Sequence, residues 1–519
     1  MTENIEKTYL NQRKNLLAFV YLILSAFILM MIATRSSFLY PCNDWNDANS
    51  YFSVGKALLN GKMPYRDVFD QKGMYLYFFY GLSYLVSHTT FFGVFLLEVI
   101  LASFDLIGIC RILELYVKKW TALFLSPLVL SVIMCSFSFY WGGSAEEVCF
   151  PFLIWGLYFS LDYFKNRYPK ETMSLKVIFS GGILAGMVAN IKFTVLGFFF
   201  AWMMCVAFSF LARKDFWGAV KGCLVFLGGM AIPFIPWMIY FAWNHSLYEW
   251  YWGYVYINVF VYSNLNEEGP SLFERIYTLS KLLYWVIRQN MIYFIFLIPG
   301  VIWSVLGRGK KWLERFNILA LCFFLFMGIY VGGSQLPYYA FPLAVFTVLG
   351  FAFLGSLIEL VFFRIIKEKN KENAALWKLV KGAVAIVSVS IGVGIIFVGS
   401  MNISHMGVKR EEHFLYQFKA IVDETPNPTL LNIGCLDAGL YTVCDIVPTC
   451  RWFQTQTLSI DDVLKEQERY ISEGRTTFVI ARDDYPEVIF DKYELVAVAP
   501  WYQGEQEFLY YLFKLKGNE

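Results

Sequence analysis

Charged residues are scarce in this chain. Only 16% of its 519 residues are Asp, Glu, Lys or Arg, whereas 58% are hydrophobic. A soluble protein of this length carries about 25% charged residues. The deficit argues against an ordinary water-soluble enzyme. The net charge of +2 gives no reason to expect a nucleic-acid partner.

Metal ligands and cleavage signals are scarce as well. The 4 histidines are scattered and the 10 cysteines show no metal-binding spacing. The sequence therefore indicates no cofactor, and it leaves the binding of a divalent metal ion as an open alternative. Cys435, Cys444 and Cys450 lie in the charged C-terminal region, where a disulfide and buried free thiols are both open. Residues 15–34 lack a small-residue cleavage pattern, so we expect an uncleaved first span.

The chain has instead a series of apolar runs near the length that crosses a bilayer as a helix. A lipid-exposed backbone must satisfy its own hydrogen bonds, so we expect membrane helices. The predicted spans number about 11. They are residues 15–34, 91–117, 121–139, 148–164, 175–190, 194–212, 219–243, 285–306, 316–331, 340–363 and 379–400.

Basic residues predict which side each connection occupies. Lys7, Arg13 and Lys14 place the N-terminus in the cytoplasm. Residues 74–87 are apolar but only about 14 long, so we expect an interfacial or re-entrant segment. All later basic clusters then lie inside, together with the loop 364–378. The clusters are Lys118–Lys119, Lys165/Arg167/Lys170, Arg213/Lys214/Lys221 and Arg308–Arg315.

This topology gathers four segments on the outer side: residues 36–73, 140–147, about 244–284, and 332–339. Lys192 lies at an outer helix end, and the C-terminus is outside. Residues 401–519 are charged and mixed, with a helical stretch at about 460–473 and strand-like runs at 429–433, 476–481, 493–499 and 508–515. We therefore predict a transmembrane domain over 1–400 and a small α/β domain outside the membrane over 401–519.

The first outer loop has the densest mixture of charges beside any predicted span. Residues 40–73 read YPCNDWNDANSYFSVGKALLNGKMPYRDVFDQKG, and a connection of about 35 residues is far longer than most. Asp44 and Asp47 are simple turn formers if each is taken alone. As a functional group, a carboxylate at the membrane surface can accept a proton from a hydroxyl.

Other charged residues stand near the same predicted surface. Glu146 and Glu147 stand at the start of a predicted apolar helix, where their negative charges interact favourably with the helix dipole. However, placing two carboxylates beside hydrocarbon costs free energy, and such residues are usually functional. One interpretation applies to Lys72, Arg66 and Lys192 alike: their charged groups extend along the apolar surface to the lipid phosphates. Lys72, close to Asp70, also fits a cation that holds a phosphate leaving group.

Tyr338 and Tyr339 fit an aromatic belt at the membrane interface, with ligand contact as the alternative. An outer site lacks access to nucleotide sugars, so group transfer there needs an activated donor that resides in the membrane. A polyprenyl-phosphate sugar meets that need.

The first loop resembles the signature of the GT-C fold glycosyltransferases, of the protein O-mannosyltransferase and aminoarabinose transferase type. That pattern is an acidic residue, Tyr or Phe four or five positions on, a short amphipathic helix, Gly-x-x-Pro-Tyr and a Lys-Gly or Lys-Pro. The matching positions are Asp47, Tyr51, Gly61, Pro64, Tyr65 and Lys72. The run S-A-E-E-V-C-F-P (144–151) resembles the second acidic motif, and Lys192 and residues 337–342 resemble later features. The family often has Asp-Glu at the first motif, whereas Ala48 follows Asp47 here.

The resemblance implies an inverting transferase that moves a sugar from a polyprenyl phosphate to an envelope acceptor on the outer face. Asp47 is the expected base, with Asp44 as the alternative. Glu146 and Glu147 would position the acceptor, and Lys72, with Arg66 and Lys192, would stabilise the departing phosphate. Two other classes fit the composition: a transporter or flippase of lipid-linked sugars, and an inactive sugar-binding scaffold.

Overall fold

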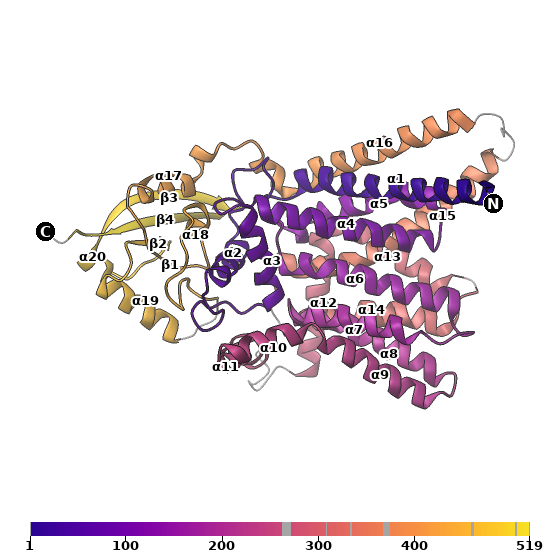
Figure 1. Cartoon of the computed structure of the whole chain (residues 1–519), viewed down its shortest axis with the longest axis horizontal. Coiled ribbons are helices and arrows are strands. Elements are labelled where there is room, and N and C mark those ends of the chain that lie inside the picture. Colours follow the sequence, from indigo (N-terminus) through magenta and orange to yellow (C-terminus); the bar gives the residue numbers. More distant parts are fainter. Residues whose placement is uncertain are drawn as a thin grey trace. The chain divides into compact units, whose positions relative to one another are not determined.

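The computed structural model describes residues 2–261, 271–307, 309–332, 335–366, 374–457, 461–503 and 506–517. Helices dominate, and the strands of the described part all lie after residue 429 (Figure 1). Arg308 and parts of three predicted connections, residues 262–270, 333–334 and 367–373, lie outside the described residues.

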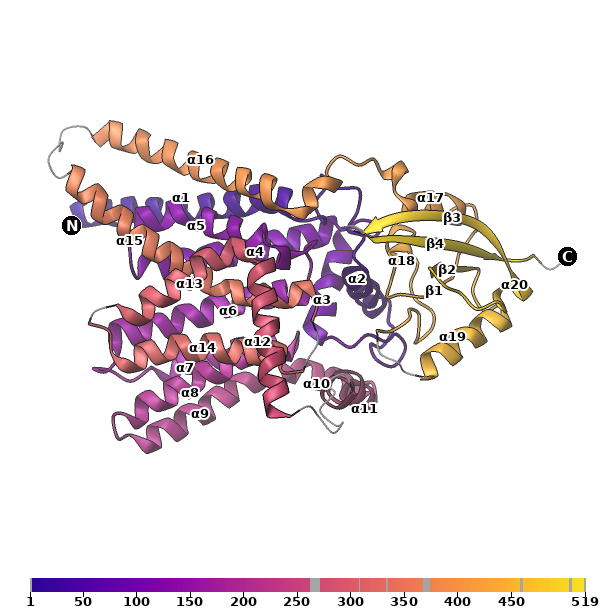
Figure 2. The same ribbon diagram turned by 180° about the vertical axis from the view of Figure 1, so that it is seen from behind.

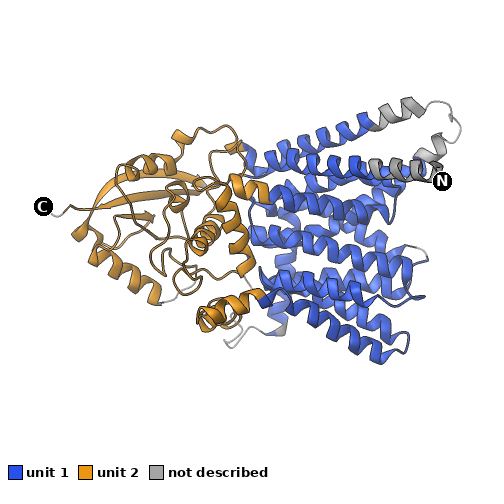
Figure 3. Ribbon diagram, in the orientation of Figure 1, with its two compact units in different colours: residues 1–34, 98–235, 270–403 blue, residues 35–97, 236–269, 404–519 orange. Residues whose placement is uncertain are grey.

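The chain divides into two compact units that are interleaved in sequence (Figure 3). Unit 1 comprises Met1–Thr34, Glu98–Ile235 and Pro270–Ile403, and unit 2 comprises Arg35–Leu97, Pro236–Gly269 and Ser404–Glu519. The first loop and the C-terminal region therefore belong to the same unit. The predicted division into a transmembrane domain over 1–400 and an α/β domain outside the membrane over 401–519 stays a prediction.

Unit 1 is a bundle of apolar helices that run side by side (Figures 1 and 2). They are α1 (Thr2–Ala33), α4 (Phe92–Glu114, whose first turns belong to unit 2), α5 (Lys119–Met134), α6 (Ala145–Asp162), α7 (Leu175–Ala189), α8 (Gly197–Leu211), α9 (Phe216–Ala231), α13 (Met291–Leu306), α14 (Trp312–Tyr330), α15 (Thr347–Ile366) and α16 (Ala374–Gly399). Short tight helices precede two of them, η3 (Phe193–Leu196) before α8 and η5 (Pro337–Phe346) before α15.

Small residues let these helices approach closely. On α7, a Cβ at Gly182 would lie 2.2 Å from the carbonyl oxygen of Phe226 on α9. On α9, a Cβ at Gly229 would lie 2.3 Å from the carbonyl oxygen of Phe179. Such contacts are typical of helix packing in membranes, where burial of apolar surface does not drive association.

Every predicted span overlaps a helix, but the predicted span 219–243 is not one continuous helix, because α9 ends at Ala231 and the next helix begins at Phe234. Six helices are long and apolar enough to cross a bilayer by length and composition, and up to eight if each of two bent pairs is one span. The helices α5 and α7 have only 16 and 15 residues, and α6 begins with two glutamates. The predicted count of about 11 spans, with the N-terminus inside and the C-terminus outside, stays a prediction.

The predicted span 285–306 is wrong in one respect, because it is not one continuous helix. The helix α12 (Leu272–Gln289) ends before Asn290, and α13 continues after a bend of 112°. The side-chain oxygen of Asn290 accepts a hydrogen bond from the Ser138 amide at 2.9 Å, which holds the break. Figure 2 shows α12 running across the direction of its neighbours in the bundle.

Unit 2 combines short helices with a sheet. The helices are α2 (Asn46–Leu59), α3 (Met74–Val86), α10 (Phe234–Trp243), α11 (Leu247–Trp250), the π-helix η4 (Tyr251–Val261), α17 (Phe414–Val422), α18 (Leu440–Val443), α19 (Asp461–Glu473) and α20 (Ile489–Lys492). The predicted outer loop 244–284 is thus largely helical within the described residues. The helix α3 has 13 residues, about 20 Å, which is short for a span of about 30 Å.

The sheet has four strands in the order β1-β2-β4-β3. They are β1 (Leu430–Ile433), β2 (Phe478–Arg482), β3 (Tyr493–Gln503) and β4 (Gln506–Leu515). β1 pairs with β2 in parallel, and β4 pairs antiparallel with β2 and β3. The predicted helix at 460–473 and all four predicted strands are confirmed.

The first loop is joined to the C-terminal region by buried polar contacts. The ammonium of Lys56 on α2 donates to the carbonyl oxygen of Tyr441 at 2.8 Å. The side-chain amide of Gln454 donates to the hydroxyl of Ser50 at 2.7 Å. Buried polar contacts of this kind are costly to break, so α2 is a rigid support for the residues at its start.

Candidate active site

Asp47 lies in the first turn of α2, which begins at Asn46 after Trp45. Asp47 is 8% exposed. A negative charge in the first turn interacts favourably with the helix dipole. Trp45 occupies the cap position, so Asp47 stands inside the helix rather than before it.

Asp44 has a different environment, although it is only three residues away. Its carboxylate accepts from the Arg35 guanidinium at 2.7 Å and from the Trp501 indole nitrogen at 2.7 Å, and His413 lies 3.8 Å away. Burial alone would raise the pKa of Asp44, but Arg35 and His413 outweigh it and hold the pKa well below its usual range. Asp44 is therefore a weak base that is committed to a buried ion pair.

Lys72 is held through its backbone. Its amide donates to the hydroxyl of Tyr77 at 2.7 Å, and its carbonyl accepts from the hydroxyl of Tyr65 at 2.6 Å. The Tyr77 hydroxyl donates in turn to Asp70 at 2.8 Å. Burial raises the pKa of Asp70, although Lys72 and Tyr77 oppose the shift. The Lys72 ammonium lies 6.0 Å from the ring centre of Tyr51.

The structure therefore brings Tyr51, Tyr65 and Lys72 together and leaves Arg66 with other partners. Arg66 donates to both carboxylate oxygens of Asp67, at 2.8 and 3.0 Å, and it contacts the Ser246 hydroxyl at 3.3 Å. The fully buried Tyr65 acts on the backbone of Lys72, which is a positioning contact.

The remaining predicted residues meet in unit 1. The Ser144 hydroxyl caps α6 by accepting from the Glu147 amide at 2.9 Å, and the Glu147 carboxylate accepts from the Gly143 amide at 2.7 Å. Glu146 forms a buried ion pair with Lys192. The Lys192 ammonium also lies 3.7 Å from the ring centre of Tyr339 and 5.4 Å from that of Tyr338.

Sequence reasoning missed two buried carboxyls on α4. Glu98 accepts from the Thr34 hydroxyl at 2.8 Å. Asp105 is 1% exposed, and within the described residues neither of its oxygens has a hydrogen-bond partner. Asp105 interacts electrostatically with Glu147. Acidic residues inside the apolar run 91–117 are the signal that would have found them, because such residues are rare in membrane helices.

The described residues contain no group of three or more His, Cys, Asp or Glu that could hold a metal ion. All ten cysteines are free, including Cys435, Cys444 and Cys450. The predicted site residues are carboxylates, basic side chains and tyrosines. A carboxylate can accept a proton and an ammonium can stabilise a developing phosphate charge.

The long apolar helices of the described residues indicate a multi-pass membrane protein. The fold is similar to that of ArnT from Cupriavidus metallidurans. The structure of ArnT bound to undecaprenyl phosphate matches with a TM-score of 0.56 over 96% of this chain and 97% of that chain, at 10% identity. The apo structure matches with a TM-score of 0.57 over 97% and 98%, at 11% identity. No protein-family model and no curated protein matches the sequence.

Proposed function

We propose that this protein is a glycosyltransferase that moves one sugar from a polyprenyl-phosphate donor to an acceptor hydroxyl on the outer face of the membrane. The observation that carries the proposal is the first loop of unit 2. There a carboxylate on a rigid helix and a lysine clamped by two tyrosines lie in one compact unit. The ArnT fold, with one structure bound to undecaprenyl phosphate, supports a lipid-linked donor.

In the proposed reaction, the acceptor oxygen attacks the anomeric carbon while the bond from that carbon to the phosphate oxygen breaks. The displacement is direct, so the anomeric configuration inverts. Asp47 takes the proton of the acceptor hydroxyl. The polyprenyl phosphate leaves with the electron pair of the broken bond, and Lys72 stabilises its charge.

Asp47 is preferred over Asp44 because their surroundings differ. Asp44 is already neutralised by Arg35 in a buried pair, and proton acceptance there would break that pair. For the residues of unit 1, we propose that Glu146 and Glu147 position the acceptor. We assign Lys192, which is paired with Glu146, a supporting role.

The test is sugar transfer by purified protein in detergent, with a labelled polyprenyl-phosphate sugar as the donor and a nucleotide sugar as the comparison. The parent should use only the lipid donor. Asp47→Asn keeps the size of the side chain and loses its charge, so turnover should fall about 10²–10⁴-fold while the protein stays folded.

Asp44→Asn is the matched control, measured per folded molecule. It leaves the buried Arg35 without its charge partner, so its main effect should be lower thermal stability, since breaking a buried pair costs about 3–5 kcal/mol. Full activity of both variants would refute the mechanism. Transfer from the nucleotide sugar without lipid would refute the donor class. After reconstitution into vesicles, movement of the lipid-linked sugar between leaflets without transfer would favour a flippase.

A further inference from the structure

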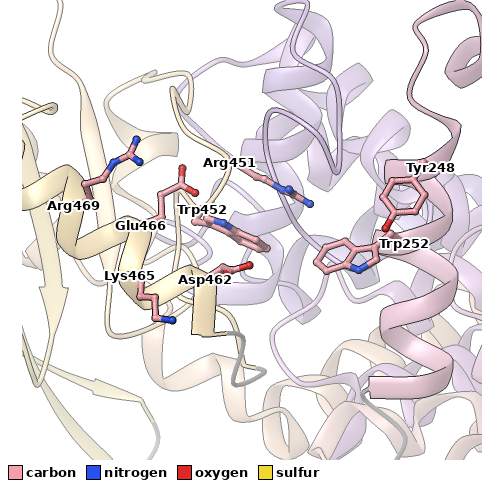
Figure 4. Close-up of a pocket in the computed structure, with 8 residues that line it drawn as sticks. All are labelled: Tyr248, Trp252, Arg451, Trp452, Asp462, Lys465, Glu466 and Arg469. Atoms are coloured by element: carbon pink, nitrogen blue, oxygen red, sulfur yellow. The ribbon is translucent and has the colours of Figure 1, made fainter.

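A cavity of about 470 Å³ opens in unit 2, apart from every residue assigned to sugar transfer (Figure 4). It lies between α11 and η4 on one side and α19 on the other, with Arg451 and Trp452 of the segment that precedes α19 between them. Its volume falls within the range of about 300–1,000 Å³ that is usual for small-ligand sites.

The floor of the cavity is rigid and aromatic. Trp452 is 3% exposed and packs on Phe69 with ring centres 4.7 Å apart. Trp252 packs on the same ring at 5.6 Å. Tyr248, one helical turn before Trp252, is 70% exposed at the rim. This wall offers flat apolar faces with little conformational freedom to lose on binding.

Arg451 projects between the aromatic groups in Figure 4. Its guanidinium lies 5.1 Å from the ring centre of Trp252 and 4.9 Å from that of Trp452. Stacking on two rings holds the planar guanidinium in one orientation. Its N–H groups are thus a preorganised set of donors beside the aromatic wall.

The helix α19 supplies both kinds of polar group to the opposite wall. Asp462 and Glu466 are one turn apart and provide acceptors, while Lys465 and Arg469 are one turn apart and provide donors. With Arg451, three cations and two carboxylates line the cavity. The two carboxylates would repel a simple anion, and the three positive charges would repel a simple cation.

We infer that this cavity binds a neutral saccharide, as a site separate from sugar transfer. A sugar ring has an apolar face that can lie on aromatic rings, and its hydroxyls both donate and accept. Such a ligand uses the aromatic wall, the donors and the acceptors together and brings no charge of its own to a lining in which Arg469 is already paired with Glu473 at 3.6 Å. The inference concerns binding alone and does not depend on the proposed transfer reaction.

The experiment is saturation-transfer NMR of neutral tetrasaccharides built from glucose, mannose or N-acetylglucosamine, titrated against the full-length protein in detergent without any lipid donor. At least one should bind. Tyr248→Ala should weaken that binding about fivefold to tenfold, through loss of the ring contact. Glu466→Gln should weaken it as well, through loss of a charged acceptor.

Two matched variants serve as controls. Tyr256→Ala removes an exposed aromatic of η4 that does not line the cavity, and Glu468→Gln removes a carboxylate of α19 that does not line it. Both should bind like the parent, and so should Asp47→Asn, whatever its transferase activity.

The inference is overturned if no neutral tetrasaccharide binds. It is equally overturned if binding is unchanged in both Tyr248→Ala and Glu466→Gln, or if inorganic phosphate competes for the same site more strongly than the saccharides do.

Discussion

Asp437 is a fully buried carboxyl that links α2 to the C-terminal region. It accepts from the Ser53 hydroxyl and from the Gly439 amide. Burial raises its pKa to about 6, and these hydrogen bonds and the charge of Lys56 offset only part of the rise. The folded protein therefore keeps a proton on this carboxyl at a pH where the unfolded chain has lost it.

This shift predicts the sign of a pH effect on stability. The unfolded pKa is about 3.9, so the contribution of Asp437 to stability is present below that pH and is lost as pH rises towards about 6. The melting temperature should fall between pH 4.5 and 6.5, and Asp437→Asn should reduce that fall by about 2–4 °C. The readout is thermal unfolding of the purified protein at each pH.

Asp423→Asn is a suitable control. Asp423 is exposed, lies in the same C-terminal region as Asp437, and forms an ion pair with Lys419. Its pH profile should match that of the parent. An Asp437→Asn profile identical to the parent's would show that Asp437 titrates normally.

The local sequence predicted the roles of only some of the site residues. The family pattern singled out Asp47, but it could not show that Asp44 is paired with Arg35 and accepts a hydrogen bond from Trp501. Trp501 lies far along the chain, and local spacing carries no information about such pairs. Asp105 was detectable in principle, since an acid within an apolar run needs an explanation.

At the level of elements, the crossing of α2 and α3 connects Asp47 with Lys72. A Cβ at Gly55 would lie 2.6 Å from the backbone nitrogen of Gly81 and 2.7 Å from the carbonyl oxygen of Tyr77. The two helices touch backbone to backbone at this point. The α2 residue Tyr51 also packs on Tyr80 of α3, with ring centres 5.6 Å apart.

Gly55→Ala should therefore push α2 away from α3. We expect a loss of about 1–3 kcal/mol of stability from overpacking, and a drop in transfer of about 100-fold if the displacement of Asp47 approaches 1 Å. Thermal unfolding and the transfer assay measure the two effects. Gly228→Ala is the control, since a Cβ at Gly228 meets nothing within 4 Å, and it should keep parental stability and activity.

Element positions were well predicted where the pattern is periodic or uniformly apolar. The four strands and α19 appeared near their predicted residues because alternation and amphipathicity are local signals. The break at Asn290 was missed because the last residues of α12, from Trp285, continue without a Gly or Pro into the apolar α13. Only the contact of Asn290 with Ser138, 152 positions away, explains the break.

At the scale of the whole molecule, the membrane topology remains the main prediction. In a cysteine-free background, Glu468→Cys in α19 should react with an impermeant reagent in intact cells. Lys214→Cys, in the exposed turn after α8, should react only after permeabilisation, because basic connections stay inside. The reverse pattern would contradict the predicted orientation.

The interleaving of unit 2 has a consequence for the timing of biosynthesis. Asp44 and its partner Trp501 are 457 positions apart. At about 5–20 residues per second, a ribosome needs on the order of 20–90 seconds to cover that distance. For that interval Asp44 exists without the strand β3 that supplies Trp501, and buried polar groups of α2 such as Lys56 also await their C-terminal partners. The first loop is therefore translated early but completes its buried polar contacts only when the last strands have been made.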